Sequence, residues 1–472
     1  MPCAMRSLTR KPKTDCSKNW TKNSPRLNVS SSSKKHLGFW DLLSISLGQV
    51  IGIGVVVLTG IAIAMTGYGT PWAFLLALFI VAIPTVCIAA LGSAVPNTGG
   101  NYTYVRDLLG PKTSFVYLAL LVAAQIFLAA MALSFADYAQ GLLPQTETAT
   151  FPLKPVAVIV IVLVYIANLF GLKAAARLQT LLVLGLITAL LLYIGLGMSH
   201  VTDYGPYIAP GLVMPNGLAG FFAAAFLLRL SLVGSEFVAE FGGEMHKPGK
   251  TIPLVMATTL AVVICLYVGV SIVATGVLPI DQVKGATLAG VAREIFSPPV
   301  YYAFIIGGVL VALVTSLNAI FAWCTRGLYM ASLDGWLPKK LAVTNRFGTH
   351  YIFLTLFFLV GLTPILIGMT IDQVSVLGNA FGAVFGILPV LALYNLASRN
   401  PEAYKRAPFK LPKWAMKTLP LMALIIYSYG IYFSWDFIGV KSAVIFGLYA
   451  ACAFAYAVWR QPVVLNKIQS GK

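Results

Sequence analysis

The feature that most constrains this chain is a long series of apolar segments, each of which is long enough to cross a bilayer as a helix. A hydropathy window of about 19 residues separates twelve of them. Lipid offers no hydrogen-bond partners to a backbone, so each segment must satisfy its own N–H and C=O groups by forming a helix. The sequence therefore predicts an all-α, polytopic membrane protein with about 12 transmembrane helices. The predicted spans are residues 42–65, 72–94, 113–143, 153–170, 178–199, 217–242, 252–276, 299–331, 350–369, 374–397, 416–435 and 440–460.

The overall composition supports the same class of protein. Hydrophobic residues make up 58% of the chain and charged residues 10%, whereas about a quarter of the residues of a soluble domain are charged. The six cysteines have no CxxC spacing, so we interpret them as packing residues rather than as disulfides or metal ligands. We expect no cofactor and no metal site.

The 33 Lys and Arg residues are distributed unevenly between the predicted loops. Most lie in the two terminal tails and in the loops on the same side of the membrane. The loops on the opposite side hold Lys154, Lys284, Arg293 and Lys441. Because cytoplasmic loops carry the excess of basic residues, we expect a multi-pass protein of the cell membrane with both termini in the cytoplasm. The net charge of +18 is then explained by topology and by contact with the lipid bilayer, not by binding of nucleic acid.

The predicted helices fall into two sets of five that resemble each other in hydropathy. Each set opens with a span that glycine interrupts, and a long connection precedes its long third span. Because five is odd, the second set enters the membrane from the opposite side, which is typical of an inverted repeat. The predicted parts are a disordered basic cytoplasmic tail (1–38), the first repeat (39–200), the second repeat (201–398), helices 11 and 12 (399–462) and a cytoplasmic tail (463–472).

Two glycines, Gly52 and Gly54, lie one residue apart in the middle of the first span. Glycine destabilises a helix interior by about 1 kcal/mol relative to alanine. The pair is therefore either a notch for close helix packing or a break in the helix. Gly234 and Ser235 occupy the corresponding place in the sixth span. Paired interruptions in two matching halves favour the break, and they indicate a substrate site near the membrane midplane.

The sixth span also holds three charged residues, Arg229, Glu236 and Glu240. Each costs about 2.5–3.5 kcal/mol at the centre of a membrane helix, so such residues normally face the bundle interior or a water-filled cavity. One interpretation is structural: Arg229 and Glu236 are seven residues apart and could pair on one face, or bond to neighbouring carbonyls. The other is functional, with the charges serving substrate binding, gating or coupling.

Four motifs follow one another along the chain. They are Val50-Ile-Gly-Ile-Gly54 in helix one, Pro96-Asn-Thr-Gly-Gly-Asn-Tyr-Thr-Tyr104 with Gly110-Pro111 after helix two, Gly234-Ser-Glu236 with Gly243-Glu244 and Pro248 in and after helix six, and Ser316-Leu-Asn318 with Arg326-Gly327 and Asp334-Gly335 at helix eight. In this order they resemble the motifs of the amino acid–polyamine–organocation (APC) superfamily of amino acid permeases, and the resemblance covers about residues 38 to 460.

This resemblance implies a LeuT-like fold of two inverted five-helix repeats. It also implies a secondary transporter that moves amino acids by alternating access, as a symporter or an exchanger. The substrate carboxylate would bind the N–H groups after the break in helix one, and its ammonium group the freed carbonyls of helices one and six. Ile53 departs from the small residue usual in the family and would narrow the approach. The implied binding residues are Val50, Ile51, Gly52, Ile53, Gly54, Val55, Leu230, Ser231, Leu232, Val233, Gly234, Ser235 and Glu236.

The coupling ion, H⁺ or Na⁺, is left open by the sequence. Hydroxyls of Thr315 and Ser316 could serve a sodium site, or could bond the carbonyls of the preceding turn. Some proton-coupled members of the family carry a lysine in helix five, but here Leu186 takes that place in a stretch without ionisable residues. The candidate gating or coupling residues are Arg229, Glu240, Thr315, Ser316 and Asn318.

Charged residues at the cytoplasmic ends of the spans have two interpretations. They could form an ion-pair network that closes the cytoplasmic side, or they could be separately solvated. The residues concerned are Arg106, Asp107, Glu244, Arg326 and Asp334.

Two alternative functions compete with amino acid transport. A transporter of polyamines or other organic cations would use exposed acidic groups such as Glu236 and would need no carboxylate site. A membrane-embedded enzyme is disfavoured, because the four histidines lie in loops or at span ends and no catalytic residues are predicted. The identity of the amino acid and the oligomeric state are not determined by the sequence.

Overall fold

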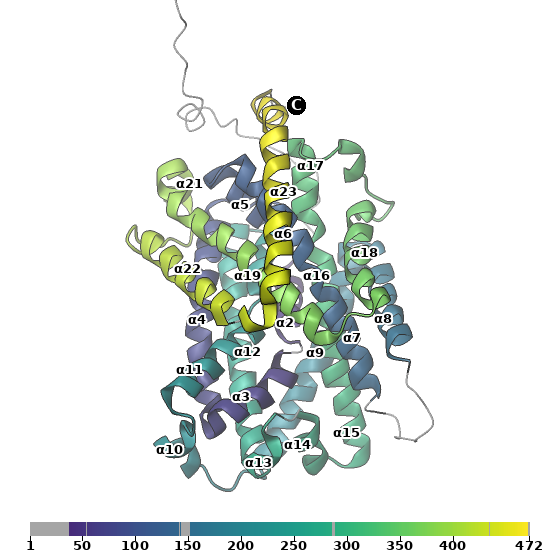
Figure 1. Cartoon of the computed structure of the whole chain (residues 1–472), viewed down its shortest axis with the longest axis vertical. Helices are drawn as coiled ribbons and strands as arrows, with labels where there is room; N and C mark the ends of the chain where they lie inside the picture. The colour runs from purple at the N-terminus through teal and green to yellow at the C-terminus, as the bar shows by residue number, and fades with distance from the viewer. Residues whose placement is uncertain are drawn as a thin grey trace, which may run out of the picture.

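The computed structural model describes residues 37–52, 54–140, 142, 152–285, 288–433 and 435–470, and these residues form a bundle of helices (Figure 1). Within this part, eight helices are long and apolar enough to cross a membrane. Two shorter apolar helices, Leu153–Leu169 and Tyr351–Ile367, lie beside them. No β-strand forms among the described residues. The prediction of an all-α, polytopic membrane protein is confirmed, and the count of about 12 spans stays a prediction.

The first half of the chain begins with an interrupted helix and continues with long helices. Most of the predicted tail, residues 1–36, lies outside the described part of the chain, and so does Ile53. The helical elements are α2 (Phe39–Val50), η1 (Gly54–Leu58), α3 (Thr59–Thr66), η2 (Gly67–Gly69), α4 (Thr70–Ala94), α5 (Gly100–Leu108), α6 (Pro111–Ala124), α7 (Phe127–Gln140), α8 (Leu153–Leu169) and α9 (Leu172–Met198).

The second half repeats the pattern of an interrupted helix followed by long ones, and two further helices end the chain. The main elements are α11 (Gly217–Leu228), η4 (Arg229–Ser231), η5 (Ser235–Glu240), α12 (Pro248–Gly276), α15 (Pro298–Phe304), η6 (Ile305–Leu310), α16 (Val311–Trp323), α17 (Thr325–Asp334), α18 (Tyr351–Ile367), α19 (Ile371–Ala392), α22 (Ala415–Phe433) and α23 (Trp435–Ser470). The short connecting elements are η3 (Gly205–Tyr207), α10 (Pro210–Val213), α13 (Ile280–Val283), α14 (Leu288–Ile295), η7 (Lys339–Ala342), η8 (Leu393–Asn395), α20 (Leu396–Arg399) and α21 (Pro401–Arg406).

The bundle has two apolar cores, one toward each end. One core gathers buried residues of α5, α6, α7, α8, α16 and α18. The other gathers residues of α3, α9, α11, the second half of α12 and η6. Helix α4 packs along α12, and its first half belongs to one core and its second half to the other. Helix α2 packs against α9, α12 and α16, which places the interruption of the first span inside the bundle.

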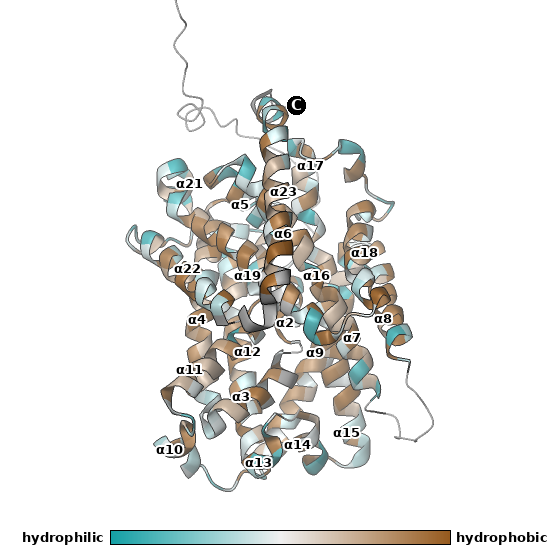
Figure 2. Ribbon diagram, in the orientation of Figure 1, coloured by the Kyte–Doolittle hydropathy of each residue, from teal (hydrophilic) through white to brown (hydrophobic). Residues whose placement is uncertain are grey.

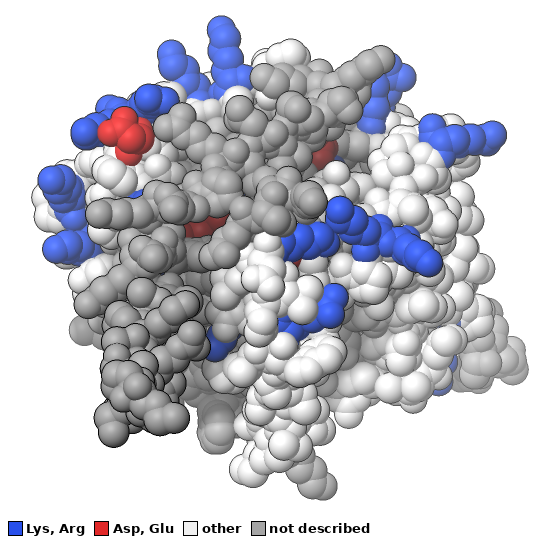
Figure 3. Space-filling model, turned by 90° about the horizontal axis from the view of Figure 1, so that it is seen from above, with Lys and Arg blue, Asp and Glu red and all other residues white. Residues whose placement is uncertain are grey.

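The outside of the bundle is apolar in the middle and polar at the two ends (Figure 2). Large side chains such as Leu181, Ile425 and Ile445 are between 65% and 69% exposed. Such a surface is unfavourable in water and favourable in lipid. The end that carries α5, α17 and the C-terminus presents many Lys and Arg side chains and few exposed carboxylates (Figure 3). The basic loops therefore gather at one end, as the sequence predicted; that this end is cytoplasmic stays a prediction.

We expect that alanine at Gly361 destabilises the bundle, because its Cβ would lie 2.7 Å from the Leu128 Cβ and 2.9 Å from the Ile161 Cδ1. Overpacking of this kind costs about 1–3 kcal/mol. The matched control is Gly185→Ala in α9, where a Cβ meets no atom within 4 Å. Thermal unfolding in detergent should show a lower Tm for Gly361→Ala and an equal or higher Tm for Gly185→Ala. Equal Tm values for Gly361→Ala and the wild type would contradict the packing.

Candidate functional site

The regular helix of the first span ends at Val50 and resumes at Gly54. Ile51 has an extended conformation, with φ −81° and ψ 95°, and its N–H still donates to the Leu47 carbonyl. From Gly54 to Leu58 the chain forms a π-helix, which leads into α3. We call residues 51–52 the first interruption. The helix N-terminus that follows it leaves N–H groups without partners in the preceding turn.

The sixth span changes its conformation over a longer stretch. Helix α11 ends at Leu228 and is followed by the 3₁₀ turn η4. Gly234 then has φ 137°, a conformation that residues other than glycine rarely adopt. The chain continues as the 3₁₀ helix η5. We call residues 232–234 the second interruption. The Gly234 N–H donates to the Glu236 Oε2 at 2.9 Å. The Glu236 side chain therefore satisfies one backbone N–H group that has no helical partner in the turn.

The two interruptions lie against each other, and glycine makes this approach possible. A Cβ on Gly54 would lie 2.4 Å from the Ser231 Cβ and 2.6 Å from the Ser231 Cα. A Cβ on Gly234 would lie 2.7 Å from the Gln49 Cγ, and one on Gly52 would lie 2.6 Å from the Ser316 Oγ. Real Cβ atoms do not come this close to other atoms. The glycines therefore bring the backbones of the first, sixth and eighth spans together.

One side chain joins both interruptions. The Tyr267 hydroxyl of α12 lies 3.2 Å from the Val50 carbonyl oxygen and 3.3 Å from the Ser231 carbonyl oxygen, and it is buried. Both carbonyls belong to residues where the regular helix has ended. Since an unpartnered buried carbonyl is costly, Tyr267 stabilises both interruptions at once. The sequence analysis missed this residue; the only available signal was a tyrosine at the centre of an otherwise apolar span.

The predicted substrate-binding residues are brought together, with two exceptions. Leu230 is 36% exposed, and Ile53 lies outside the described residues. The Ser235 hydroxyl is fully buried and has no hydrogen-bond partner among the described residues. Val233 and Glu236 are half-buried. The buried members of the set are Val50, Ile51, Gly52, Gly54, Val55, Ser231, Leu232, Gly234 and Ser235.

The pairing of Arg229 with Glu236, one of the interpretations drawn from the sequence, is wrong. Neither residue forms an ion pair with the other. The Arg229 guanidinium carbon instead lies 5.0 Å from the centre of the Phe226 ring and 5.9 Å from that of Tyr427 in α22. The reason is geometric: the pairing assumes a continuous helix from 229 to 236, and the turn at Gly234 changes the direction in which Glu236 points.

The hydroxyls proposed for a sodium site are engaged in hydrogen bonds with carbonyls. The Thr315 hydroxyl donates to the Ala312 carbonyl at 2.8 Å, and the Ser316 hydroxyl donates to the Gly48 carbonyl at 3.0 Å. The first of these is the bond to the preceding turn that the sequence also allowed. The second joins α16 to the last turn of α2.

Beside the hydrogen bond between α16 and α2, neutral amide side chains join further helices. Asn318 donates to the Gln179 Oε1 at 2.6 Å, and Gln179 donates to the Thr315 carbonyl at 3.1 Å. Asn168 donates in turn to the Asn318 Oδ1 at 2.8 Å. These side chains come from α8, α9 and α16 and form one buried network. Gln179 of the fifth span and Asn168 of the fourth were missed because only ionisable groups were considered as polar candidates in this region.

One end of the bundle is held by buried ion pairs, and we call it the ion-paired end. Arg106 of α5 donates to both carboxylate oxygens of Asp334 at 2.9 Å, and the Tyr102 hydroxyl donates to Asp334 at 2.7 Å. Arg326 binds Glu244 through two nitrogens, at 2.9 and 3.0 Å. Burial by itself lowers the pKa of Arg106, but the nearby Asp107 and Asp334 carboxylates raise this pKa well above its usual value. The network predicted from the sequence is therefore present, and separate solvation of these charges is excluded.

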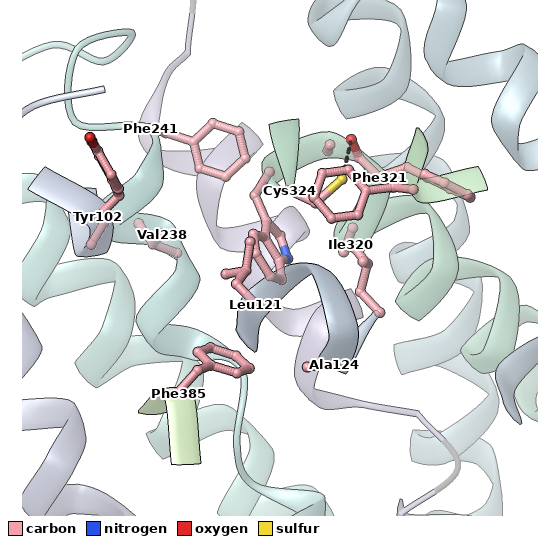
Figure 4. Close-up of a cluster of buried hydrophobic side chains, with 14 of the residues drawn as sticks. Tyr102, Leu121, Ala124, Val238, Phe241, Ile320, Phe321, Cys324 and Phe385 are labelled. Carbon is pink, nitrogen blue, oxygen red and sulfur yellow. Dashed lines mark hydrogen bonds between the residues drawn. The ribbon is translucent and has the colours of Figure 1, made fainter. Parts of the chain in front are cut away.

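Buried side chains fill the space between the interruptions and the ion-paired end (Figure 4). Leu121, Phe241 and Phe385 belong to this cluster, and the Phe237 and Trp323 rings stack with their centres 3.9 Å apart. A narrow gap that is too small for a water molecule remains here. It is lined by Tyr117, Leu121, Glu240, Trp323, Cys324 and Gly327.

The sequence profile of the family described as amino acid permease matches residues 37–458. The chain belongs to this family. This permease is 28% identical over 418 residues to the branched-chain amino acid permease BcaP of Bacillus subtilis (strain 168), with 84% of the chain and 87% of that protein covered. The same bacterium has a methylthioribose transporter that is 27% identical over 88% of the chain and 91% of that protein. Its serine/threonine exchanger SteT is 23% identical over 83% of the chain and 89% of that protein.

The family membership confirms the expected class of protein. The chain is a multi-pass membrane transporter and not an enzyme. Among the described residues, no group of three His, Cys, Asp or Glu side chains could hold a metal ion. The binding residues named above are not tested by these comparisons and stay predictions.

We expect that Tyr267→Phe destabilises the permease, because both carbonyls then lose their donor. The cost should be about 1–3 kcal/mol. Tyr193→Phe is the matched control, because the Tyr193 hydroxyl is buried without a partner and its removal should be neutral or stabilising. Thermal unfolding of the two variants in the same detergent separates these cases. A Tyr267→Phe protein as stable as Tyr193→Phe would show that the hydroxyl does not stabilise the interruptions.

Proposed function

We propose that this protein moves amino acids across the cell membrane by alternating access, with the substrate bound between the two interruptions. The observation that carries the proposal is the contact between Gly54 and Ser231, where two spans without regular helical structure meet inside the bundle. Irregular backbone at membrane depth is tolerated where it lines a binding site or is buried in protein.

The chemistry of the interruptions suits a zwitterion. The N–H groups at Gly54 and Val55 begin a helix, and the positive end of its dipole favours a carboxylate. Carbonyl oxygens of the second interruption offer acceptors to an ammonium group. An α-amino acid carries these two charges on one carbon and can bridge the two spans.

Side-chain selectivity would come from residues that border the interruptions. The unpartnered Ser235 hydroxyl offers a hydrogen bond to a ligand, because a buried hydroxyl without a partner is costly. Leu232 adds apolar surface beside it. The similar proteins named above are described as carrying different substrates, so the amino acid is identified here only as a class.

Transport of an organic cation is the second candidate function. Glu236 supports it, because this half-buried carboxylate forms no ion pair with another described residue and accepts the Gly234 N–H. A cation would not need the N–H groups at Gly54. The two candidates therefore differ in whether a substrate carboxylate is required.

We expect that Gly54→Leu abolishes transport, because its side chain would occupy the space held by Ser231. Purified protein in liposomes should exchange radiolabelled amino acids in counterflow, and the variant should lose at least about 90% of this rate. Gly195→Leu in α9, where a Cβ meets no atom within 4 Å, is the control and should keep it.

The same assay decides between the two candidate functions. Amino acids should compete with one another, and amines that lack the carboxylate should compete poorly. Saturable counterflow of a polyamine with none of any common amino acid would replace the first candidate with the second. Full activity of Gly54→Leu would contradict the proposed site.

A further inference from the structure

Glu240, the last residue of η5, is a buried carboxylate without an ion pair among the described residues. It is 2% exposed. Its Oε1 accepts the Asn101 N–H at 3.1 Å. Glu244, four residues later, differs because it is paired with Arg326. An ionised carboxylate inside a membrane protein is costly unless something compensates its charge.

One oxygen near Glu240 is also incompletely satisfied. Among the described residues, the buried Tyr104 hydroxyl has no hydrogen-bond partner. Burial, and after it the charge of Glu240, raises the pKa of Tyr104, which places that hydroxyl within electrostatic reach of the carboxylate. A buried carboxylate without an ion pair, next to a buried hydroxyl without a partner, favours the binding of a further positive charge.

The gap beside Glu240 limits what can supply this charge. Glu240 and Tyr117 both line it, and it has no room for a water-sized ligand. A metal ion with several oxygen ligands, or an amine, needs more room than this. A proton needs none.

The position of Glu240 links it to the ion-paired end. Its backbone carbonyl accepts the Gly99 N–H at 3.1 Å, and its side chain accepts the Asn101 N–H. Both donors lie at the N-terminus of α5, where a negative charge is favourable. The same helix carries Tyr102 and Arg106, which bind Asp334. Ionised Glu240 thus stabilises the helix that closes this end.

We propose that Glu240 is a proton-binding site, and that its protonation releases the N-terminus of α5 and loosens the ion-paired end. The inference rests on the proposed transport function, to which it adds the coupling or regulating ion. In net terms, a hydronium ion of the bulk solvent gives up one proton and becomes water, and a new O–H bond forms at a Glu240 carboxylate oxygen. The neutral carboxyl no longer favours the N-terminus of α5 and provides a donor for the neighbouring oxygens.

Other titratable groups surround Glu240 and have to be separated from it. Three helices near Glu240 contribute no charged group that faces it. Helix α4 carries no Asp, Glu, Lys or Arg. The Asp41 carboxylate of α2 accepts the Gly38 N–H, and Lys250 of α12 is exposed. Glu236 and Glu244 lie on the same stretch of chain. The groups that face Glu240 electrostatically are Tyr104 of α5, Tyr117 of α6, Cys324 between α16 and α17, and Arg326 of α17.

The test is amino acid counterflow in liposomes with equal pH on both sides, measured between about pH 5 and about pH 8. The wild-type rate should rise as the pH falls, with a slope of at most about tenfold per pH unit, because one proton is bound. Glu240→Gln, which mimics the neutral form, should keep the fast acid-side rate across the range and vary by less than about twofold. The exposed Glu402→Gln is the matched control and should keep the wild-type profile.

Two further measurements keep the inference separate from folding and from the proposed function. Glu240→Asp should fold and retain a pH dependence with a shifted midpoint. Infrared difference spectra of the wild type should show a buried carboxylic acid C=O band that titrates with pH and is missing in Glu240→Gln. This band decides the protonation of Glu240 even if no amino acid is transported, which would overturn the proposed function alone. A wild-type pH profile in Glu240→Gln, or an unchanged band, would overturn the inference.

Discussion

The requirement that every polar backbone group finds a partner governs this structure, because lipid supplies none. Two spans depart from regular helix inside the bundle, and each departure frees carbonyl and N–H groups. Side chains from other helices bind several of them: Tyr267 binds carbonyls of both spans, and Ser316 binds the Gly48 carbonyl. Glycine at positions 52, 54 and 234 lets the spans approach closely enough for these bonds. The polar groups that remain are those to which we assign the substrate.

The short helix η5 connects the candidate site with the ion-paired end. It begins directly after Gly234, at the second interruption, and ends at Glu240, which caps α5. A rearrangement of the second interruption during transport would therefore be transmitted to α5 and to its ion pair with Asp334. Elsewhere in the bundle, the amide network of Gln179 and Asn318 holds α9 and α16 together. We expect these two helices to stay in place during such a movement.

The sequence predicted features that depend on local patterns, and it failed where distant residues meet. Apolar length predicted membrane-spanning helices, of which the described residues form eight that are long and apolar enough, and the glycines at 52, 54 and 234 lie where the helices become irregular. For the charges at the span ends the sequence left ion pairs and separate solvation open, and Arg106 and Arg326 form ion pairs. The pairing of Arg229 with Glu236 failed because it assumed helical periodicity across a turn. Tyr267, Gln179 and Asn168 carry no local signal, since the partners of these uncharged residues lie far away in the sequence.

The account depends most on the claim that the two interruptions together form the substrate site. The most direct measurement is a high-resolution electron cryomicroscopy structure of the protein in lipid nanodiscs, saturated with an amino acid that it transports in liposomes. The account predicts density for the amino acid between the two interruptions, with the carboxylate at the N–H groups of Gly54 and Val55 and the ammonium group at carbonyls of the sixth span. Density for the transported amino acid elsewhere in the bundle, with these backbone groups bound only by protein, would contradict it.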